Sequence, residues 1–429
     1  MQPVFSETQK DAVDIFKKIQ SNLGPLGKYS NQIHGYFTFP KLEGEIGPHM
    51  KFRGKEVLNW ILNDYLGLAN LPEVRQADIE VVTKWGLAYP MGSRVLSGQT
   101  NLHEQLESEL AEFVGKENAY VLNAGYQGMI SVITTLCSRH DVVVYDSEVH
   151  ASVIDGVHLH IGKRFVYQHN NMESLEKQLK RAVAVADKQQ GGVLVITEGV
   201  FAVSGELSQL DQITALKDKY DFRLLLNDAH GFGTMGVTGA GTAEHFDVQN
   251  KVDLYFAVFS NTMGTFGGFV AGKEQIINYL RYNMRSQIYS KSLPMTIVAG
   301  ILKRFEILKA RPELRKQLWK TTHTLQKELK ASGFNIGNTN SMITPVFFSV
   351  GIPEATNMVM DLRENYSLFC AIISYPTIQK GQLLLQLTPT SSHTIEDIEY
   401  TIKALTSVRA NLEAGQYRAE DSADNGNTD

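Results

Sequence analysis

The chain has 429 residues, of which 43% are hydrophobic and 20% are charged. This ordinary globular composition excludes a mainly disordered chain, because a chain this apolar can bury a core. Lysine and arginine number 41 against 46 aspartates and glutamates, which gives a net charge of −5. The chain therefore lacks the basic excess that general nucleic-acid binding requires.

The sequence shows no pattern typical of export, membrane insertion or metal binding. Cys137 and Cys370 lie far apart in apolar surroundings, which favours buried thiols over a disulfide framework. Residues 1–24 are mixed polar and lack the apolar core of a signal peptide. The most apolar stretch, 192–203, is shorter than the roughly 20 residues that span a bilayer. We expect a cytoplasmic protein with no metal site.

The N-terminal part predicts a helix followed by an arm. Residues 7–20 place Val13, Phe16 and Ile19 at helical spacing among polar residues. Residues 21–57 are rich in glycine and proline and predict an extended segment. We therefore expect a helix and arm over 1–57, before a large domain over 58–294.

From about residue 105 the chain alternates between helical and strand patterns. The predicted strands are 119–122, 141–145, 164–167, 193–197, 222–226, 254–259 and 268–271. The predicted helices are 106–114, 125–137, 172–188 and 211–220. This alternation predicts an α/β fold whose large domain contains a mostly parallel, doubly wound sheet.

The pattern changes after residue 294, where a smaller α+β domain is expected over 295–412. Its predicted elements are helices at 295–311, 313–332 and 395–411 and strands at 343–349 and 382–387. The remaining residues, 413–429, are polar and acidic towards the end, and we expect a disordered tail there.

Polar and small residues follow several predicted strands. In an open parallel sheet, ligands bind beyond the carboxyl ends of the strands. The small residues of 123–128 precede a helix and suit either a bound phosphate or a tight turn. His150 suits either stacking on a flat cofactor or simple packing, and polar loops follow at 227–233 and 260–268. Together these loops predict a ligand site at one edge of the sheet.

These loops resemble those of the α-oxoamine synthases, a branch of the fold-type I pyridoxal-phosphate (PLP) enzymes that includes serine palmitoyltransferase. The resemblance runs collinearly over about residues 20–412. The segments that carry it are 63–68, 92–98 with His103 and 106–107, 123–128, 150–152, 196–201, 228–231 and 393–394. The resemblance implies the aminotransferase-like fold, PLP as cofactor, and a dimer with its sites at the subunit boundary.

The family joins an amino acid to an acyl-CoA, and the resemblance assigns roles to individual residues. The chemistry needs a lysine that forms a Schiff base, a carboxylate at the pyridine nitrogen and an arginine for the substrate carboxylate. The implied cofactor-binding positions are Gly125, Tyr126, His150 (ring stacking), Asn227, His230 and Ser260. The implied substrate positions are Asp64 and Gln386, and Ser290 and Lys291 resemble a stretch that reaches the neighbouring subunit's phosphate site.

Three of these positions depart from the family pattern. Asn261 stands at the Schiff-base lysine position, Asn227 at that of the pyridine aspartate and Gln386 at that of the substrate arginine. Val258 replaces a hydroxyl that usually bonds the phosphate. Asp228 is not expected to substitute for Asn227, because neighbouring strand residues point to opposite faces. Each departure at the three main positions exchanges a charged side chain for a neutral amide.

Three functions remain open. The favoured hypothesis is a degenerate synthase that does not condense an amino acid with an acyl-CoA by itself. It would act as a non-catalytic subunit in a homodimer, or in a heterodimer with an active paralogue. The second is an active PLP-dependent acyltransferase that uses another lysine, Lys291 being the nearest candidate by motif. The third is a protein that binds PLP or another ligand without a covalent bond.

Overall fold

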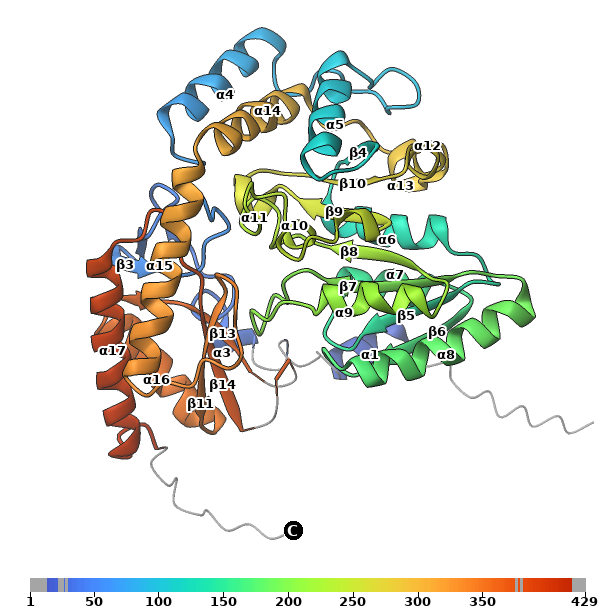
Figure 1. The fold of residues 1–429 in the computed structure, drawn as a ribbon. Helices are drawn as coiled ribbons and strands as arrows, with labels where there is room; N and C mark the ends of the chain where they lie inside the picture. The colour runs from blue at the N-terminus through green and yellow to red at the C-terminus, as the bar shows by residue number, and fades with distance from the viewer. Residues whose placement is uncertain (1–13, 22–26, 28–29, 375–376, 379–380, 419–429) are drawn as a thin grey trace, which may run out of the picture.

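The computed structural model describes residues 14–21, 27, 30–374, 377–378 and 381–418, and within them a seven-stranded sheet forms the centre of the larger lobe (Figure 1). Its strands are β4 (Asn118–Leu122), β5 (Val142–Asp146), β6 (Lys163–Tyr167), β7 (Val193–Glu198), β8 (Arg223–Asn227), β9 (Leu254–Val258) and β10 (Gly268–Gly272). The spatial order is β4-β10-β9-β8-β7-β5-β6. All neighbouring pairs from β6 to β9 are parallel, whereas β10 is antiparallel to β4 and β9. This confirms the predicted fold class.

Helices cover both faces of this sheet. They include α5 (Asn101–Phe113), α6 (Gly125–Leu136), α7 (Ala151–Leu159), α8 (Met172–Gln189), α9 (Leu210–Ala215) with the 3-10 turn Leu216–Asp218, α10 (Thr242–His245), the turn Gln249–Lys251, α11 (Ser260–Met263), α12 (Glu274–Asn283) and α13 (Arg285–Ile288). Val142 and Val144 of β5 pack in the core on the side of α8, whereas Val143 and Tyr145 pack with α6 and α7. Burial on both faces explains why the strands read as continuous apolar runs.

The smaller lobe combines strands that precede the large domain with elements that follow it. Its three-stranded antiparallel sheet is β11 (Thr344–Ser349), β14 (Gln382–Leu387) and β13 (Ala371–Ile373), with helices α15 (Pro312–Ala331), α16 (Ile352–Glu364) and α17 (Ile395–Glu413). A second sheet contains β1 (Leu42–Glu43), β2 (His49–Phe52), β3 (Lys55–Asn59) and β12 (Leu368–Phe369). Because β12 pairs in parallel with β3, residues expected to form an arm are part of this lobe. Trp60 belongs to the hydrophobic core of the smaller lobe, and its ring stacks on that of His393 with the ring centroids 4.0 Å apart.

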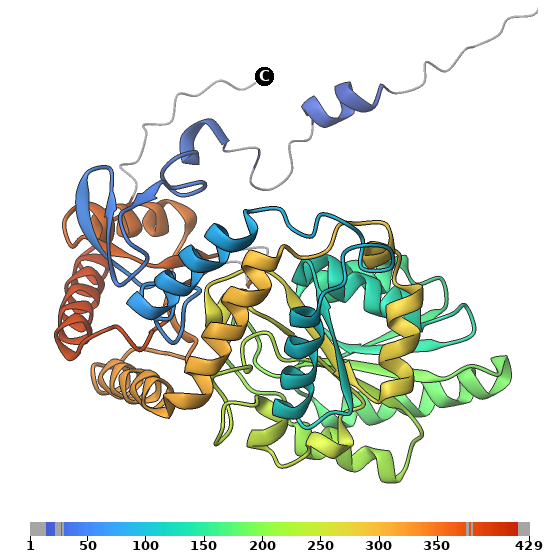
Figure 2. The same cartoon turned by 90° about the horizontal axis from the view of Figure 1, so that it is seen from above.

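Two helices connect the lobes. α4 (Pro72–Trp85) lies along α14 (Met295–Ala310), and α14 leads directly into α15 of the smaller lobe (Figures 1 and 2). Arg304 makes two hydrogen bonds to Asp78, of 2.8 and 2.7 Å, across the α4–α14 contact. The helices α14 and α15 therefore run directly from the larger lobe into the smaller one.

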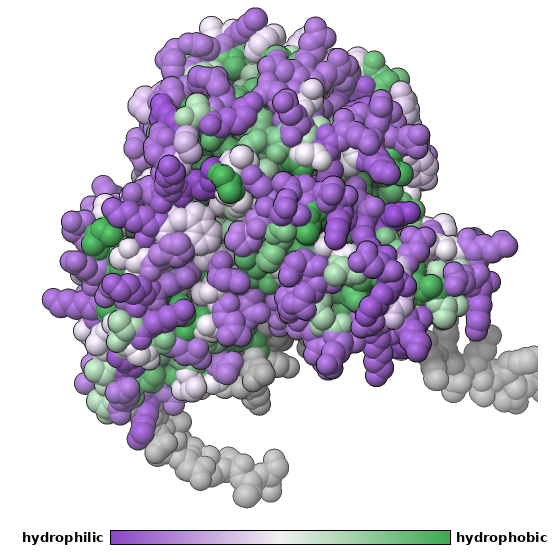
Figure 3. All heavy atoms as spheres, viewed as in Figure 1, coloured by the Kyte–Doolittle hydropathy of each residue, from purple (hydrophilic) through white to green (hydrophobic). Residues whose placement is uncertain are grey.

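Only parts of the predicted N-terminal helix and C-terminal tail fall among the residues that the structure describes. Near the N-terminus, α1 (Ile15–Ser21) overlaps the predicted helix 7–20, whose residues 7–13 lie outside the described residues. The short helix α3 (Ser30–Ile33) lies in the expected arm. Of the predicted tail, residues 419–429 also lie outside them. No helix in the described ranges is both long and apolar enough to cross a membrane. Hydrophilic residues cover most of the face in Figure 3, with smaller apolar areas between them.

Candidate active site

A pocket of about 770 Å³ opens beyond the carboxyl ends of β5 and β7, facing β11 and β14 of the smaller lobe. Its described lining residues are Ser147, Glu148, Val149, His150, Ala151, Glu198, Phe201, Ala202, Val203, Ser204, Phe347, Thr377, Ile378, Gln382 and Leu384. The two segments after β5 and β7 supply most of this wall. This is the edge of the sheet where the sequence predicted a ligand site.

His150 stands at the wall of this pocket with an exposed ring. It is the N-cap of α7, and its Nδ1 accepts a hydrogen bond of 3.2 Å from the backbone N–H of Ser152. Its own backbone N–H donates to Glu198 Oε1 at 2.9 Å. Desolvation lowers the pKa of His150, which favours a neutral ring. The ring is therefore fixed at its base and open to a flat ligand.

Asn227 and Glu198 face each other as the last residues of the neighbouring strands β8 and β7. Both residues are buried, and the Asn227 amide lies next to the Glu198 carboxyl. Among the described residues, nothing hydrogen-bonds Asn227 Oδ1. Burial raises the pKa of Glu198 to about 8. Glu198 lies in the segment 196–201 that carries the family resemblance, but no motif marks it as a site residue by itself.

Asp228 points to the opposite side of β8. Its carboxylate accepts hydrogen bonds from the Thr242 backbone N–H at 2.7 Å, the Thr242 hydroxyl at 2.8 Å and the Tyr255 hydroxyl at 2.9 Å. All of these contacts lie in the core away from Asn227, as the alternation of strand residues requires. Asp228 therefore does not take the place of a carboxylate at position 227.

Asn261 lies in the short helix α11, where its amide is held by the chain itself. Its Nδ2 donates to the Ala229 carbonyl at 2.9 Å and lies 3.3 Å from Nδ1 of His230. The Tyr65 hydroxyl lies 2.7 Å from the same nitrogen. Burial, and secondarily His150, lowers the pKa of His230 to about 4, so its ring is neutral. Ser260 precedes Asn261 and is exposed. The contact of Tyr65 with His230 joins residues 165 positions apart, which the sequence did not indicate.

The start of α6 packs tightly against β9. A Cβ atom on Gly125 would lie 2.3 Å from Cγ1 of Val258, so any larger residue there would have to displace the Val258 side chain. The N-cap residue, Ala124, makes no side-chain cap, and the first backbone N–H groups of a helix have no partner within it. Tyr126 is half-exposed, donates its hydroxyl to Asp155 and meets the His150 ring edge-on at 5.8 Å.

The two predicted substrate residues are engaged within the chain. Gln386 Nε2 donates to the Ala202 carbonyl at 2.6 Å, which fixes part of the pocket wall. Asp64 accepts backbone hydrogen bonds from Leu68 at 2.8 Å and Ala69 at 3.1 Å. Burial raises the pKa of Asp64 to about 6. Asp64 is not among the described residues that line the pocket.

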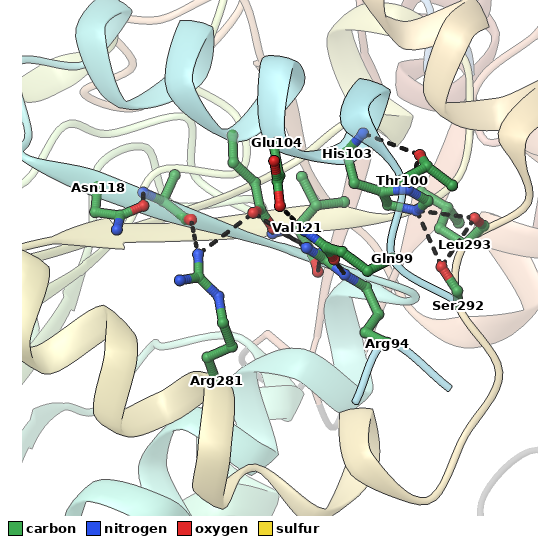
Figure 4. Close-up of polar contacts among 12 residues, drawn as sticks. Arg94, Gln99, Thr100, His103, Glu104, Asn118, Val121, Arg281, Ser292 and Leu293 are labelled. Carbon is green, nitrogen blue, oxygen red and sulfur yellow. Dashed lines mark hydrogen bonds and ion pairs between the residues drawn. The ribbon is translucent and has the colours of Figure 1, made fainter. Parts of the chain in front are cut away.

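Ser290 and Lys291 lie beside the loop that precedes α6. The Asn123 amide donates to Ser290 Oγ at 2.9 Å and also to the Lys291 carbonyl. The Lys291 side chain is exposed. Just after it, Ser292 Oγ lies 3.0 Å from Nε2 of His103 at the start of α5 (Figure 4). The segment 290–293 is thereby fixed next to the N-terminus of α6.

A buried ion pair between Arg94 and Glu107 lies in the same region, and Figure 4 shows Arg94 near His103 and Ser292. The guanidinium of Arg94 makes two hydrogen bonds to the Glu107 carboxylate, of 2.6 and 3.1 Å. Glu107 also accepts from the Val121 backbone N–H at 2.8 Å and from Arg281 at 3.3 Å. Arg94 and Arg281 both lie over the ring of Tyr120. The motif residues Arg94 and Glu107 therefore connect the segment 92–98 to α5, β4 and α12.

Comparison with known proteins agrees with this geometry. Residues 55–405 match the model of the family "Aminotransferase class I and II". The chain is 55% identical over 406 residues to a cysteate-C-fatty acyltransferase of Capnocytophaga ochracea, covering 95% of this chain and 97% of that protein. It is 34% identical over 373 residues to a serine palmitoyltransferase of Sphingobacterium spiritivorum, covering 87% and 92% of the two chains.

Solved structures give the same result. The fold superimposes on that of a serine palmitoyltransferase from S. paucimobilis, solved with bound PLP and myriocin, with a TM-score of 0.85. The two chains are 26% identical, and the match covers 94% of this chain and 100% of the other. The fold, the family model and these relatives together lead to one conclusion. The chain belongs to the aminotransferase class I and II family, within its α-oxoamine synthase branch.

Proposed function

We propose that this chain is a non-catalytic α-oxoamine synthase homologue that keeps the cofactor pocket and acts as a partner subunit. One observation carries the proposal. At the position of the Schiff-base lysine, Asn261 has an amide that is not nucleophilic and already donates to the Ala229 carbonyl. No lysine is present among the described residues that line the pocket. The described part of the pocket therefore does not supply the amine that this chemistry requires.

The residues present suit PLP held without a covalent bond. His150 would cover the ring, the Asn227 amide would face the ring nitrogen, and the N-terminus of α6 would face the phosphate. His230 and Ser260 would complete the surroundings of the ring. PLP supplies an electron sink for carbanions at an amino-acid α-carbon. In this chain no charged carboxylate at position 227 is available to hold the ring nitrogen protonated.

The position of the family's substrate arginine also carries a neutral amide in this chain, that of Gln386. An arginine at position 386 would offer a charged, forked donor for a substrate carboxylate. Gln386 is neutral, and its Nε2 is used to hold the Ala202 carbonyl. Loss of the lysine, the aspartate and the arginine at once removes three separate functions of one site, which favours a supporting role over catalysis.

The second candidate is an active acyltransferase that joins an amino acid to an acyl-CoA. Its support is the 55% identity to a protein named as a cysteate-C-fatty acyltransferase, over nearly the whole of both chains. This candidate requires another lysine to bind PLP. Lys291 is the nearest by motif, and its exposed side chain starts beside the loop before α6.

Borohydride reduction separates the two candidates. The purified chain is mixed with PLP, reduced with borohydride and analysed by intact mass and peptide mapping, with Asn261→Lys as the matched positive control. We expect no adduct on the unaltered chain and one adduct, at position 261, on the control. An adduct at a single lysine of the unaltered chain would instead establish the active alternative and identify its base.

The partner role leads to an assembly that can also be tested. We propose a homodimer, or a heterodimer with an active paralogue, in which segment 290–293 reaches the other subunit's phosphate site. The support is the exposed Lys291 side chain on a segment whose backbone is fixed by Asn123 and His103. Mixed dimers in which only one chain keeps Lys291 therefore test the contact directly.

A further inference from the structure

Glu198 and Asn227 form a buried pair in which Asn227 Oδ1 has no hydrogen-bond partner among the described residues. We propose that these two residues act as a unit that presents an amide N–H to the ring nitrogen of bound PLP. The chain would then select a pyridine ring whose nitrogen is unprotonated. This inference rests on the proposed function, because it requires the pocket to hold the cofactor.

The backbone brings the two side chains together. Glu198 and Asn227 are partners in the parallel register of β7 and β8, and each is the last residue of its strand. Their side chains are only 2% and 3% exposed. Glu198 Oε1 is occupied by the His150 backbone N–H, which orients the carboxyl and leaves its other oxygen for Asn227.

The orientation of the amide depends on the proton of Glu198. If Glu198 is a carboxylate, Asn227 must donate Nδ2 to it, which leaves Oδ1 as an unpaired acceptor. If Glu198 is a carboxylic acid, its O–H donates to Oδ1, and Nδ2 is free to donate elsewhere. The second arrangement satisfies both groups and turns a donor towards the ligand, because the two ends of an amide have the same shape.

The surroundings favour the acid form of Glu198. Asp146 at the end of β5 and Asp228, directly after β8, are nearby acids that disfavour a second negative charge. His169 lies 2.9 Å from Asp146, and its raised pKa lets it offset part of the Asp146 charge. Tyr167 of β6 and the neutral His150 supply no compensating positive charge, since burial raises the pKa of the tyrosine and lowers that of the histidine. Burial together with these acids raises the pKa of Glu198 to about 8. A buried neutral acid is the expected state at neutral pH.

A donor at the ring nitrogen changes which ligand fits. An unprotonated pyridine nitrogen accepts the Asn227 N–H, whereas a protonated or methylated nitrogen meets a second donor. A carboxylate at position 227 would reverse this selection by attracting the positive ring. The replacement of aspartate by asparagine therefore alters the protonation state that the pocket accepts, beyond removing a charge.

The test compares PLP with its ring-N-methylated analogue, which carries a fixed positive charge and accepts no hydrogen bond. Dissociation constants are measured by equilibrium dialysis for the unaltered chain and for Asn227→Asp and Glu198→Gln, at a series of pH values. We expect the unaltered chain to prefer PLP by about tenfold, the equivalent of one good hydrogen bond. Asn and Asp side chains have nearly the same size, so the methyl group of the analogue has the same steric effect in the unaltered chain and in Asn227→Asp. We expect Asn227→Asp to reduce the ratio of the two dissociation constants, analogue over PLP, by tenfold or more.

Glu198→Gln distinguishes a proton-dependent unit from simple packing. A glutamine always donates to Asn227 Oδ1, so this variant keeps the preference at every pH. The unaltered chain loses its preference as pH rises through about 8, where Glu198 becomes a carboxylate. Titration of PLP itself is common to both proteins and cancels in their ratio.

Three results would overturn the inference. They are equal binding of the two ligands by the unaltered chain, no binding of millimolar PLP, and an identical pH course for the unaltered chain and Glu198→Gln. The borohydride experiment is independent of these measurements. A lysine adduct on the unaltered chain would remove the proposed function, whereas the ligand preference reports only on Glu198 and Asn227.

Discussion

Replacement of Arg94 by methionine tests how the site region is supported. Arg94 and Glu107 form a bidentate pair whose side chains are each only 4% exposed. Removal of the arginine leaves the Glu107 carboxylate buried, which costs about 3–5 kcal/mol in comparable pairs. Glu107 keeps its contacts with the Val121 N–H at 2.8 Å and Arg281 at 3.3 Å. We therefore expect the lower end, a loss of about 3 kcal/mol of unfolding free energy.

The matched control is Arg75→Met, which breaks a 3.0 Å ion pair with Glu45 on the surface. The side chains of that pair are 47% and 73% exposed, so the expected loss is about 1 kcal/mol or less. Urea unfolding of both variants, followed by circular dichroism, gives the two free energies. Equal losses in the two variants would refute the reasoning, because burial of Glu107 would then make no difference. Adding Glu107→Leu to Arg94→Met should recover part of the loss, since the unpaired Glu107 carboxylate is removed from the interior.

Two other predictions concern the subunit boundary and the smaller lobe. In mixed dimers of a Lys291→Ala chain with an Asn261→Lys chain, borohydride reduction should attach PLP to the Asn261→Lys chain. We expect this adduct to require about tenfold more PLP than in dimers that keep Lys291, because a charge-assisted hydrogen bond is lost. The same PLP requirement in both dimers would exclude a contact of Lys291 across the subunit boundary. His393 accepts the Thr390 N–H at 3.0 Å, and burial lowers its pKa from 6.5 to about 4. Between these pH values the unfolded chain binds more protons, so the stability that neutral His393 contributes, about 3 kcal/mol, is lost as pH falls. The difference in unfolding free energy between the unaltered chain and His393→Gln should therefore shrink from about pH 6.5 to about pH 4; a constant difference would contradict the assignment.

The large-domain sheet could be predicted from local patterns because its strands are apolar on both faces. The motif-bearing loops, including 123–128 and 227–233, could likewise be placed at strand ends from the sequence alone. Elements with weak or short patterns could not. Helices α4 and α16, and β12 with only two residues, were not predicted, since β12 exists through pairing with β3 some 310 residues earlier. Helix α7 was also missed, because its start depends on the N-cap at His150.

The candidate site divides in the same way. The sequence by itself determined that amides stand at positions 227, 261 and 386, because the motifs around them place each position. What those amides do was decided by the tertiary structure: Asn261 binds the Ala229 carbonyl and Gln386 binds the Ala202 carbonyl. The pairing of Glu198 with Asn227 likewise follows from the register of two strands and from their burial. Contacts between residues far apart in the chain depend on register and packing, and a one-dimensional pattern contains neither.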